Sequence, residues 1–239
     1  MQTRYASLVV AALLFSPPSR LHAQNAPDPS GHWEGAVKAA GREIAIQIDL
    51  RRQAGGTIEG TLTGENVHGF PLSDLAVERS AVKFQVKVDG GGSFSGTLSA
   101  DGATIAGDFT TSDGAHTLPF TLARTGDAKI DAAIKSAAIS KQLEGTWNAR
   151  LEANGVSMHL MLKLSNRPDG TSAGSIANLD QGGVEIPIAA ITQQGTSVAL
   201  DVKVVSGAYA GAINADGTEL TGTWTQGAFV APLNFRRGM

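Results

Sequence analysis

The chain of 239 residues contains no cysteine. Disulfide bonds, which many small exported domains use for stability, are therefore excluded. The cysteine that anchors a lipoprotein to its lipid is excluded with them. The fold must be held by its core and its hydrogen bonds alone.

Charge of either sign is also scarce. Lys and Arg number 19 and Asp and Glu number 22, which leaves a net charge of −3. The charges are scattered, without the basic patch that binds phosphate backbones or anionic lipids. We therefore expect no nucleic-acid partner.

Long apolar runs are missing as well. The run from Leu8 to Phe15 follows Arg4, ends before two prolines, and is too short to span a bilayer. With the small residue Ala23 at a cleavage position, this pattern predicts a secretory signal over residues 1–23 and a lead-in over residues 24–30. The expected location is periplasmic or secreted, and we expect no transmembrane segment.

What the sequence does contain is a duplication. A Gly-x-Trp motif occurs at Trp33 and again at Trp147, and an arginine closes each stretch, at Arg124 and Arg237. The matching landmarks recur at an offset of about 114 residues, which indicates two tandem domains and not a short-period solenoid. The expected units are the first domain (31–125), a linker (126–142) and the second domain (143–239).

Within each copy, apolar and polar residues alternate. The run from Ile44 to Leu50 has this pattern, as does the run from Leu160 to Leu164 in the second copy. A period of two is typical of strands with one buried face. Turn pairs such as Asp101-Gly102 recur at a spacing of about ten residues, as hairpins require. We expect about eight antiparallel strands in each copy.

Such a meander has a single apolar face to bury. Closing it into a barrel buries that face and removes the open edges. Mid-strand glycines, such as Gly96 and Gly211, suit the strong coiling of a small barrel. The predicted fold class is therefore all-β, with two tandem up-and-down antiparallel β-barrels, and a β-sandwich is the alternative.

The linker is rich in alanine. Asp127 can cap a helix, and an apolar stripe runs from Ile130 to Ala137 at helical spacing. We expect a short helix that joins the two barrels as a spacer, with a hinge or a dimer contact as the alternative.

The Trp and Arg landmarks have a structural interpretation. A closed meander makes its first and last strands neighbours, so Trp33 meets Arg124 and Trp147 meets Arg237. An arginine on an indole face contributes about 0.5–2 kcal/mol. We interpret the four residues as a plug in each barrel. The pattern resembles the signature of the calycin group, which includes lipocalins and avidins, and this implies an eight-stranded barrel that holds a small apolar ligand.

The second copy carries a further set of motifs in a fixed order. They are Leu143–Trp147, Leu179–Gly183, Ile186–Ile188, Ala208–Gly211 and Gly222–Gly227. Together they resemble the small calycin-like β module that precedes the catalytic domain of some secreted bacterial α/β-hydrolases. The first copy is a diverged version, and the hydrolase domain is absent. The resemblance implies a pair of accessory modules.

One segment matches a catalytic motif. Gly170–Gly174 has the Gly-x-Ser-x-Gly form of a nucleophile elbow around Ser172. An elbow requires a strand, a sharp turn and a helix. Here a hairpin turn leads into a strand pattern, and the first copy has no serine at this place. We therefore expect no catalytic residue and no enzyme.

The histidines do not form the paired spacing of metal ligands. His32 and His116 lie on the expected first and last strands, which allows a surface metal pair, but solvated histidines are the simpler account. We predict no metal and no cofactor.

The barrel mouths remain as candidate binding sites. The loops Glu65–Pro71 and Asp180–Glu185 are long and differ between the copies, although ordinary surface loops would explain them equally. If a ligand enters, loop residues and inward side chains should contact it. These candidates are Phe84, Met158, Met161, Tyr209, His68, Asp180 and Gln181.

These patterns predict an exported, non-catalytic binding or accessory protein of unspecified role. One alternative is a lipocalin-like carrier, and another is a hydrolase-associated or weakly hydrolytic protein. The expected partner is a small apolar ligand or a secreted protein. The sequence does not determine the oligomeric state.

Overall fold

The computed structural model describes residues 27–238, except residues 40, 66, 88, 89, 133 and 154. The expected signal over residues 1–23 and residues 24–26 of the lead-in lie outside the described residues. The described chain is all-β, as predicted, with two short 3-10 turns, η1 (Leu179–Gln181) and η2 (Lys203–Val205). Across these described residues, no helix has the length and apolarity needed to cross a membrane.

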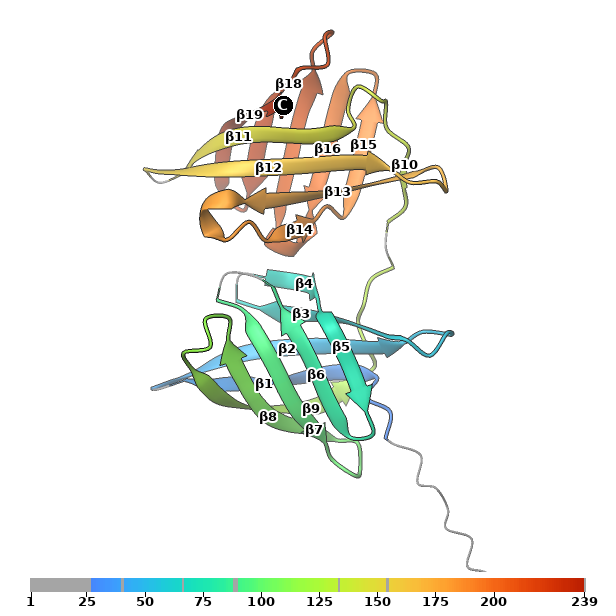
Figure 1. The fold of residues 1–239 in the computed structure, drawn as a ribbon, viewed down its shortest axis with the longest axis vertical. Coiled ribbons are helices and arrows are strands. Elements are labelled where there is room, and N and C mark those ends of the chain that lie inside the picture. The colour runs from blue at the N-terminus through green and yellow to red at the C-terminus, as the bar shows by residue number, and fades with distance from the viewer. Residues whose placement is uncertain are drawn as a thin grey trace, which may run out of the picture.

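Nine antiparallel strands form the first sheet. Their order is β4-β3-β2-β1-β9-β8-β7-β6-β5, so most strands pair with their neighbours in sequence and β1 also pairs with β9 (Figure 1). The strands are β1 (Gly31–Ala39), β2 (Arg42–Arg52), β3 (Ile58–Gly64), β4 (Val67–Pro71), β5 (Ser73–Glu78), β6 (Ala81–Val86), β7 (Gly92–Leu98), β8 (Thr104–Thr111) and β9 (Thr117–Gly126).

The second sheet repeats this arrangement with ten strands. Nine follow the order β10-β13-β12-β11-β19-β18-β17-β16-β15, and β14 also pairs with β13. The strands are β10 (Ser136–Ala137), β11 (Gly145–Ala153), β12 (Val156–Asn166), β13 (Thr171–Asn178), β14 (Glu185–Pro187), β15 (Ala190–Gln194), β16 (Ser197–Val202), β17 (Gly207–Ile213), β18 (Glu219–Gln226) and β19 (Phe229–Arg237).

Each sheet curls until its two ends nearly meet, which gives two barrel-like units in place of the paired sheets of a sandwich. In the first, the Leu72 amide donates to the Gly60 carbonyl across the seam at 2.9 Å. The equivalent bond in the second joins Ile188 to Gly174 at 3.0 Å. The predicted count of eight strands does not hold, because β4 and β5 are separate strands and the second unit gains β10 and β14.

The alternating apolar residues point inward and form one core in each barrel. Trp33 and Trp147 have no exposed surface. The two cores also meet, since Val204 of η2 is buried within the first core and Ile186 packs against both. Contact between β4 and η2 therefore joins the barrels.

The prediction of a helix in the linker is wrong. The described residues between the barrels are extended and include the short strand β10. Their backbone groups are used by the barrels. The Lys129 amide donates to Asp49 Oδ1 at 2.7 Å, and the Ile130 carbonyl accepts from Arg51 Nη1 at 3.0 Å. A helix would have paired these groups within the segment, so tertiary partners override the weak helix preference of its alanines.

Candidate functional site

One end of each barrel is closed by a stacked Trp–Arg pair. The Arg124 guanidinium carbon lies 4.7 Å from the centre of the Trp33 ring, and that of Arg237 lies 4.3 Å from the Trp147 ring. Register explains the contact, because β1 pairs Trp33 with Arg124 of β9 and β11 pairs Trp147 with Arg237 of β19. The same arrangement occurs in both copies.

All three guanidinium nitrogens of each arginine donate to backbone carbonyls. The closing arginine of the first barrel donates to the Gly102 carbonyl at 2.9 Å and to the Ser30 carbonyl at 2.6 Å. That of the second donates to the Gly217 carbonyl at 2.8 Å and to the Glu144 carbonyl at 2.7 Å. Each arginine thus ties a hairpin turn to the chain entering the barrel, which is a structural role.

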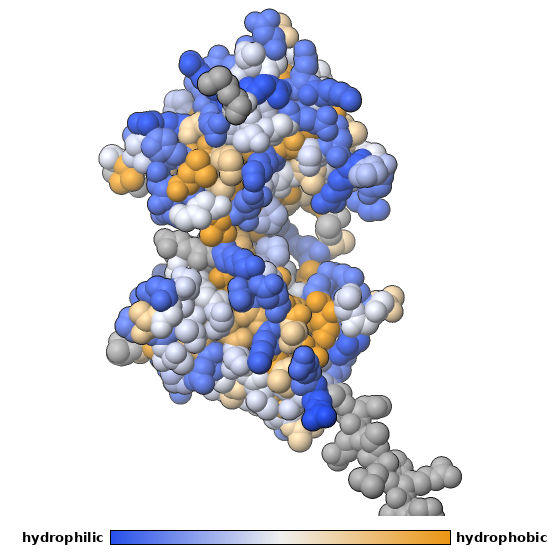
Figure 2. Space-filling model, viewed as in Figure 1, coloured by the Kyte–Doolittle hydropathy of each residue, from blue (hydrophilic) through white to orange (hydrophobic). Residues whose placement is uncertain are grey.

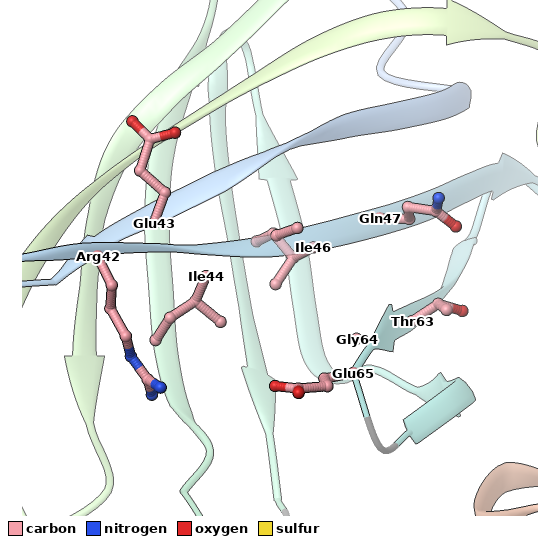
Figure 3. A pocket seen from close by; sticks show the side chains of 9 residues that line it. Arg42, Glu43, Ile44, Ile46, Gln47, Thr63, Gly64 and Glu65 are labelled. Carbon is pink, nitrogen blue, oxygen red and sulfur yellow. The ribbon is translucent and has the colours of Figure 1, made fainter.

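The opposite end of the first barrel is open. A hollow of about 450 Å³ lies there between the start of β2 and the end of β3 (Figure 3). Ligand pockets usually have volumes of about 300–1,000 Å³. The hollow is lined by Arg42, Glu43, Ile44, Ala45, Ile46, Gln47, Thr63, Gly64 and Glu65.

This hollow combines an apolar wall with charged groups at its rim. Ile46 is buried and Ile44 is half-buried against the first core. Figure 3 shows Arg42 and Ile44 on one side of β2, with Glu65 pointing toward the same space from the end of β3 and Glu43 on the opposite side. Arg42 and Glu65 are exposed. The site therefore offers an apolar surface beside one guanidinium and one carboxylate.

The second barrel has a different rim at the same end. By the register of the hairpins, Val156 occupies the position of Arg42, and Met158 that of Ile44. Val156 is 60% exposed and Leu179 of η1 is 46% exposed, so this rim is apolar where the first is charged.

Asp180, a predicted ligand contact, is engaged within the protein. Its carboxylate accepts from the His159 amide at 2.7 Å and lies 3.0 Å from His159 Nδ1. These hydrogen bonds, that from the amide first, hold the pKa of Asp180 below its usual value. Arg150 Nη2 lies 2.6 Å from His159 Nε2, so the network assigns the ring proton to Nδ1.

The other predicted loop contacts come from different barrels. Gln181 accepts from Asn178 Nδ2 at 2.9 Å at the start of η1. His68 is exposed on β4 of the first barrel. The two loops meet the same core, because Val184 of the second loop and Val67 of the first both pack against the core of the first barrel.

The predicted interior contacts are also distributed. Phe84 is buried and stacks on Phe94, with ring centres 4.7 Å apart, so it is packed core. Met158 is half-buried against the second core, at the open end of its barrel. Met161 alternates with the inward Leu160 and Leu162, which places it on the outer face of β12.

Tyr209 lies in the second core and its hydroxyl has no hydrogen-bond partner. The side chain is 1% exposed, and its ring meets Phe235 edge-on at 5.4 Å. Burial raises the pKa of Tyr209 to about 12. It does not line the hollow described above, and its hydroxyl end lies against mid-strand glycines 211 and 222.

The first barrel buries a histidine that sequence reasoning placed at the surface. His32 is 3% exposed, and its Nδ1 lies 2.7 Å from Asp49 Oδ1 while its Nε2 lies 3.0 Å from Glu34 Oε1. Lys129 of the linker lies over this group and donates its amide to Asp49. His116 is exposed in the β8–β9 connection, so the two histidines do not meet.

Ser172 does not form a nucleophile elbow. It lies within β13, is 6% exposed, and donates its hydroxyl to the Ala137 carbonyl at 2.8 Å. No helix follows among the described residues of this region. In the same described part of the chain, no three His, Asp or Glu side chains converge as metal ligands.

Sequence reasoning named the loop that begins at Glu65 but missed Arg42 and the start of β2, which form the rest of the hollow. Ile44 and Ile46 were visible as an alternating strand, but Arg42 and Glu65 are far apart in sequence and carry no motif. The only signal was their position at the ends of two strands that pair as neighbours in a meander.

Comparisons with known proteins leave the family open. No family model matches the sequence, and no curated protein matches it. Two solved structures are similar over most of the chain. A Bacteroides fragilis protein described as a "putative outer membrane protein" has 13% identity over 90% of this chain and 99% of its own, with a TM-score of 0.31.

The second is a Nostoc punctiforme protein of unknown function from the DUF3598 family. It has 12% identity over 90% of this chain and 98% of its own, with a TM-score of 0.24. At these identities and TM-scores, neither likeness carries an argument about function.

Proposed function

We propose that this chain is an exported, non-catalytic binding protein whose first barrel takes a small amphipathic ligand at its open end. The observation that carries the proposal is the hollow of about 450 Å³ between β2 and β3. Its apolar wall at Ile44 and Ile46 suits a hydrocarbon body, and its exposed rim groups, Arg42 and Glu65, suit a polar head.

The packed interior supports a ligand at the mouth in preference to one deep inside the barrel. Phe84, Phe94 and Phe109 lie in contact in the first core, with successive ring centres 4.7 Å apart. A lipocalin-like ligand would have to displace these rings. The mouth requires no such rearrangement.

The non-catalytic part of the proposal is supported by Ser172. Its hydroxyl is bonded to the Ala137 carbonyl and buried in a strand, which leaves it without the strained turn of a nucleophile elbow. A generic esterase assay, with Ser172→Ala as the control, tests this part. Ester hydrolysis that the substitution abolishes would contradict it.

Ligand binding is tested by thermal shift and native mass spectrometry with fatty acids, fatty amines and uncharged apolar compounds. A ligand at one hundred times its Kd raises the stability by about 2.7 kcal/mol. The variant Ile44→Trp fills the hollow and should abolish the shift. Met158→Trp, at the matching position of the second barrel, is the control. If no compound binds, or if Ile44→Trp binds unchanged, the proposal is wrong.

A further inference from the structure

In the second barrel, the seam between β13 and β15 is occupied by the chain's own linker. β10 pairs Ser136 with Ser172 of β13, and the Ile191 amide of β15 donates to Ser136 Oγ at 2.8 Å. The Ala138 amide donates to the Gly170 carbonyl at 3.1 Å. Figure 1 shows β10 at this edge of the barrel, beside β15. The linker therefore serves as an additional strand that contacts both sides of the seam.

The inserted strand buries the apolar side chains of this seam. Ile188 and Ile191 are 9% and 4% exposed, and Ile139 of the linker belongs to the same core at 6%. Polar side chains secure the linker on both sides. Asn166 exchanges two hydrogen bonds of 2.8 Å with the backbone of Ile139, and Gln193 accepts from the Ser140 amide.

The first barrel has the same seam between β3 and β5, but no described strand lies in it. Ile58 of β3 pairs with Arg52 of β2 on one side. On its other side, among the described residues, no strand pairs with Ile58. Leu72 and Leu75 match the two buried isoleucines of the second seam, yet both are only half-buried, as are Ile58 and Val77. This seam, defined by Ile58, Leu72, Leu75 and Val77, is the open seam.

We propose that the open seam binds an extended, apolar segment of a partner polypeptide as an added strand. An extended peptide that joins an exposed strand edge gains backbone hydrogen bonds, while side-chain pockets give specificity. The second barrel shows the geometry of such an insertion with the chain's own linker. The proposed site differs from the mouth hollow and goes beyond ligand binding there.

The chemistry of the seam determines which segment fits. In the second barrel, Ser172 and Gln193 hydrogen-bond to the linker. By register, the first barrel has Ile58 and Val77 at these two positions. Because Gln193 also donates to the Ser140 hydroxyl, a strand that fits the open seam carries an apolar side chain where the linker carries Ser140.

The chain's own counterpart of β10 is not the occupant we infer. By the repeat offset of about 114 residues, β10 corresponds to residues 22–23, which belong to the expected secretory signal. Removal of that signal takes this counterpart away. In the mature chain, a strand for this place would come from a partner.

Fluorescence anisotropy with the full mature chain, residues 24–239, and three labelled peptides tests the proposal. The first peptide has the sequence of residues 134–143, the second adds Ser140→Val, and the third further adds Ala138→Pro. We expect the second to bind about tenfold more tightly than the first, because an apolar contact with Val77 replaces a hydroxyl that has lost its side-chain partner. The proline removes a ladder donor and should weaken binding at least about tenfold.

Two protein variants test whether the peptide binds at the open seam. Ile58→Asp should abolish it, with Val156→Asp at an exposed position as the matched control. The double variant Ile58→Ser/Val77→Gln introduces groups like those of the second seam and should reverse the preference toward the first peptide. Its circular dichroism spectrum and Tm serve to show that it remains folded.

Four results would overturn the proposal. One is the absence of binding by any peptide at about 1 mM, and another is binding that Ala138→Pro or Ile58→Asp leaves unchanged. A third is a dimer in sedimentation that Ile58→Asp dissolves, since the occupant would then be a second copy. The fourth is full hydrogen-exchange protection of β3 and β5 in the mature chain alone, unchanged by peptide, because its own residues would then cover the seam.

Discussion

The first and second barrels share their Trp–Arg plug but complete their seams differently. In both, the indole is fully buried and the arginine binds a hairpin turn and the incoming chain. The second barrel then fills its seam with β10, whereas the described part of the first leaves that place free. The duplication therefore preserved what a barrel needs in order to close, and it allowed the two copies to diverge where other chain segments lie against them.

Figure 2 shows the two barrels as two rounded lobes that touch, with apolar side chains scattered among polar ones on the visible face. The two barrels differ in the surface residues that the linker contacts. The first barrel holds it over His32 and Asp49, while the matching residues of the second are Thr146 and Lys163, which are exposed. The linker thus lies on the outside of one barrel and in the seam of the other.

The largest difference in stability loss between matched substitutions in the two barrels should be seen with Asp49→Ala. The substitution leaves Nδ1 of the buried His32 without its partner and frees the Lys129 amide. Loss of these two hydrogen bonds to a carboxylate costs about 3–5 kcal/mol. Lys163→Ala, at the matching position of the second barrel, removes only an exposed ion pair and should cost less than about 1 kcal/mol. Urea unfolding followed by hydrogen exchange measures the stability of both variants. Equal losses of unfolding free energy would contradict the expected difference between the barrels.

The plug should behave alike in the two barrels. Arg124→Ala and Arg237→Ala each remove an indole stack and charged hydrogen bonds to carbonyls, which we expect to cost about 2–3 kcal/mol. Lysine cannot reproduce the forked donors, so Arg→Lys should restore less than half of the loss. Thermal unfolding monitored by tryptophan fluorescence measures this. A large loss of stability for one arginine variant and none for the other would mean that the Trp–Arg pair does not stabilise both barrels.

The linker strand should be released by Asn166→Ala. This substitution removes two hydrogen bonds to Ile139 and should cost about 1–2 kcal/mol, with faster exchange of the linker amides. Arg52→Ala, at the matching position of the first barrel, should leave those amides protected. Hydrogen exchange resolved by peptide provides the measurement, and unchanged linker exchange in Asn166→Ala would contradict the role of β10.

The smallest effect should be a gain, from Tyr209→Phe. Phe94 occupies the matching place in the first barrel, and the Tyr209 hydroxyl is buried without a partner. Removal of this group should stabilise the second barrel by about 1 kcal/mol. Urea unfolding at neutral pH measures the gain, and a loss of stability would show that the hydroxyl has a partner.

The same residue predicts a pH dependence. The pKa of Tyr209 is raised from 10.0 to about 12 on folding, so the stability it contributes is present below pH 10 and is lost as the pH rises toward 12. Because the other tyrosine, Tyr5, belongs to the expected signal, tyrosinate absorbance of the mature chain reports Tyr209 alone. Tyr209→Phe should lose less stability than the parent over this range.

Much of the architecture was predictable because it is local or repeated. The alternation from Ile44 to Leu50 and the turn pairs indicated strands, and the repeat indicated two barrels. The linker prediction failed because alanine favours a helix only weakly, by tenths of a kcal/mol per residue, whereas the barrels offer specific partners to its backbone. Arg51 and Asp49, which hold it, are about 80 residues away in sequence.

The candidate site was predictable only in part. The mouth loops pointed to the open ends, and Glu65 borders the hollow that forms there. Phe84 and Tyr209, however, pack as core, because an inward side chain in a small barrel meets other side chains before it meets a ligand. The packing of the whole interior decides which inward residues can contact a ligand.

By itself, the sequence determined the repeat, the strand periodicity and the Trp–Arg plugs, since each rests on residue type and regular spacing. The tertiary structure alone decided that the linker contains a strand, that His32 is buried, that one seam is filled while the described residues leave the other free, and where a hollow opens. These outcomes depend on contacts between residues distant along the chain. Their energies depend on which backbone and side-chain groups remain unpaired once the barrels have closed.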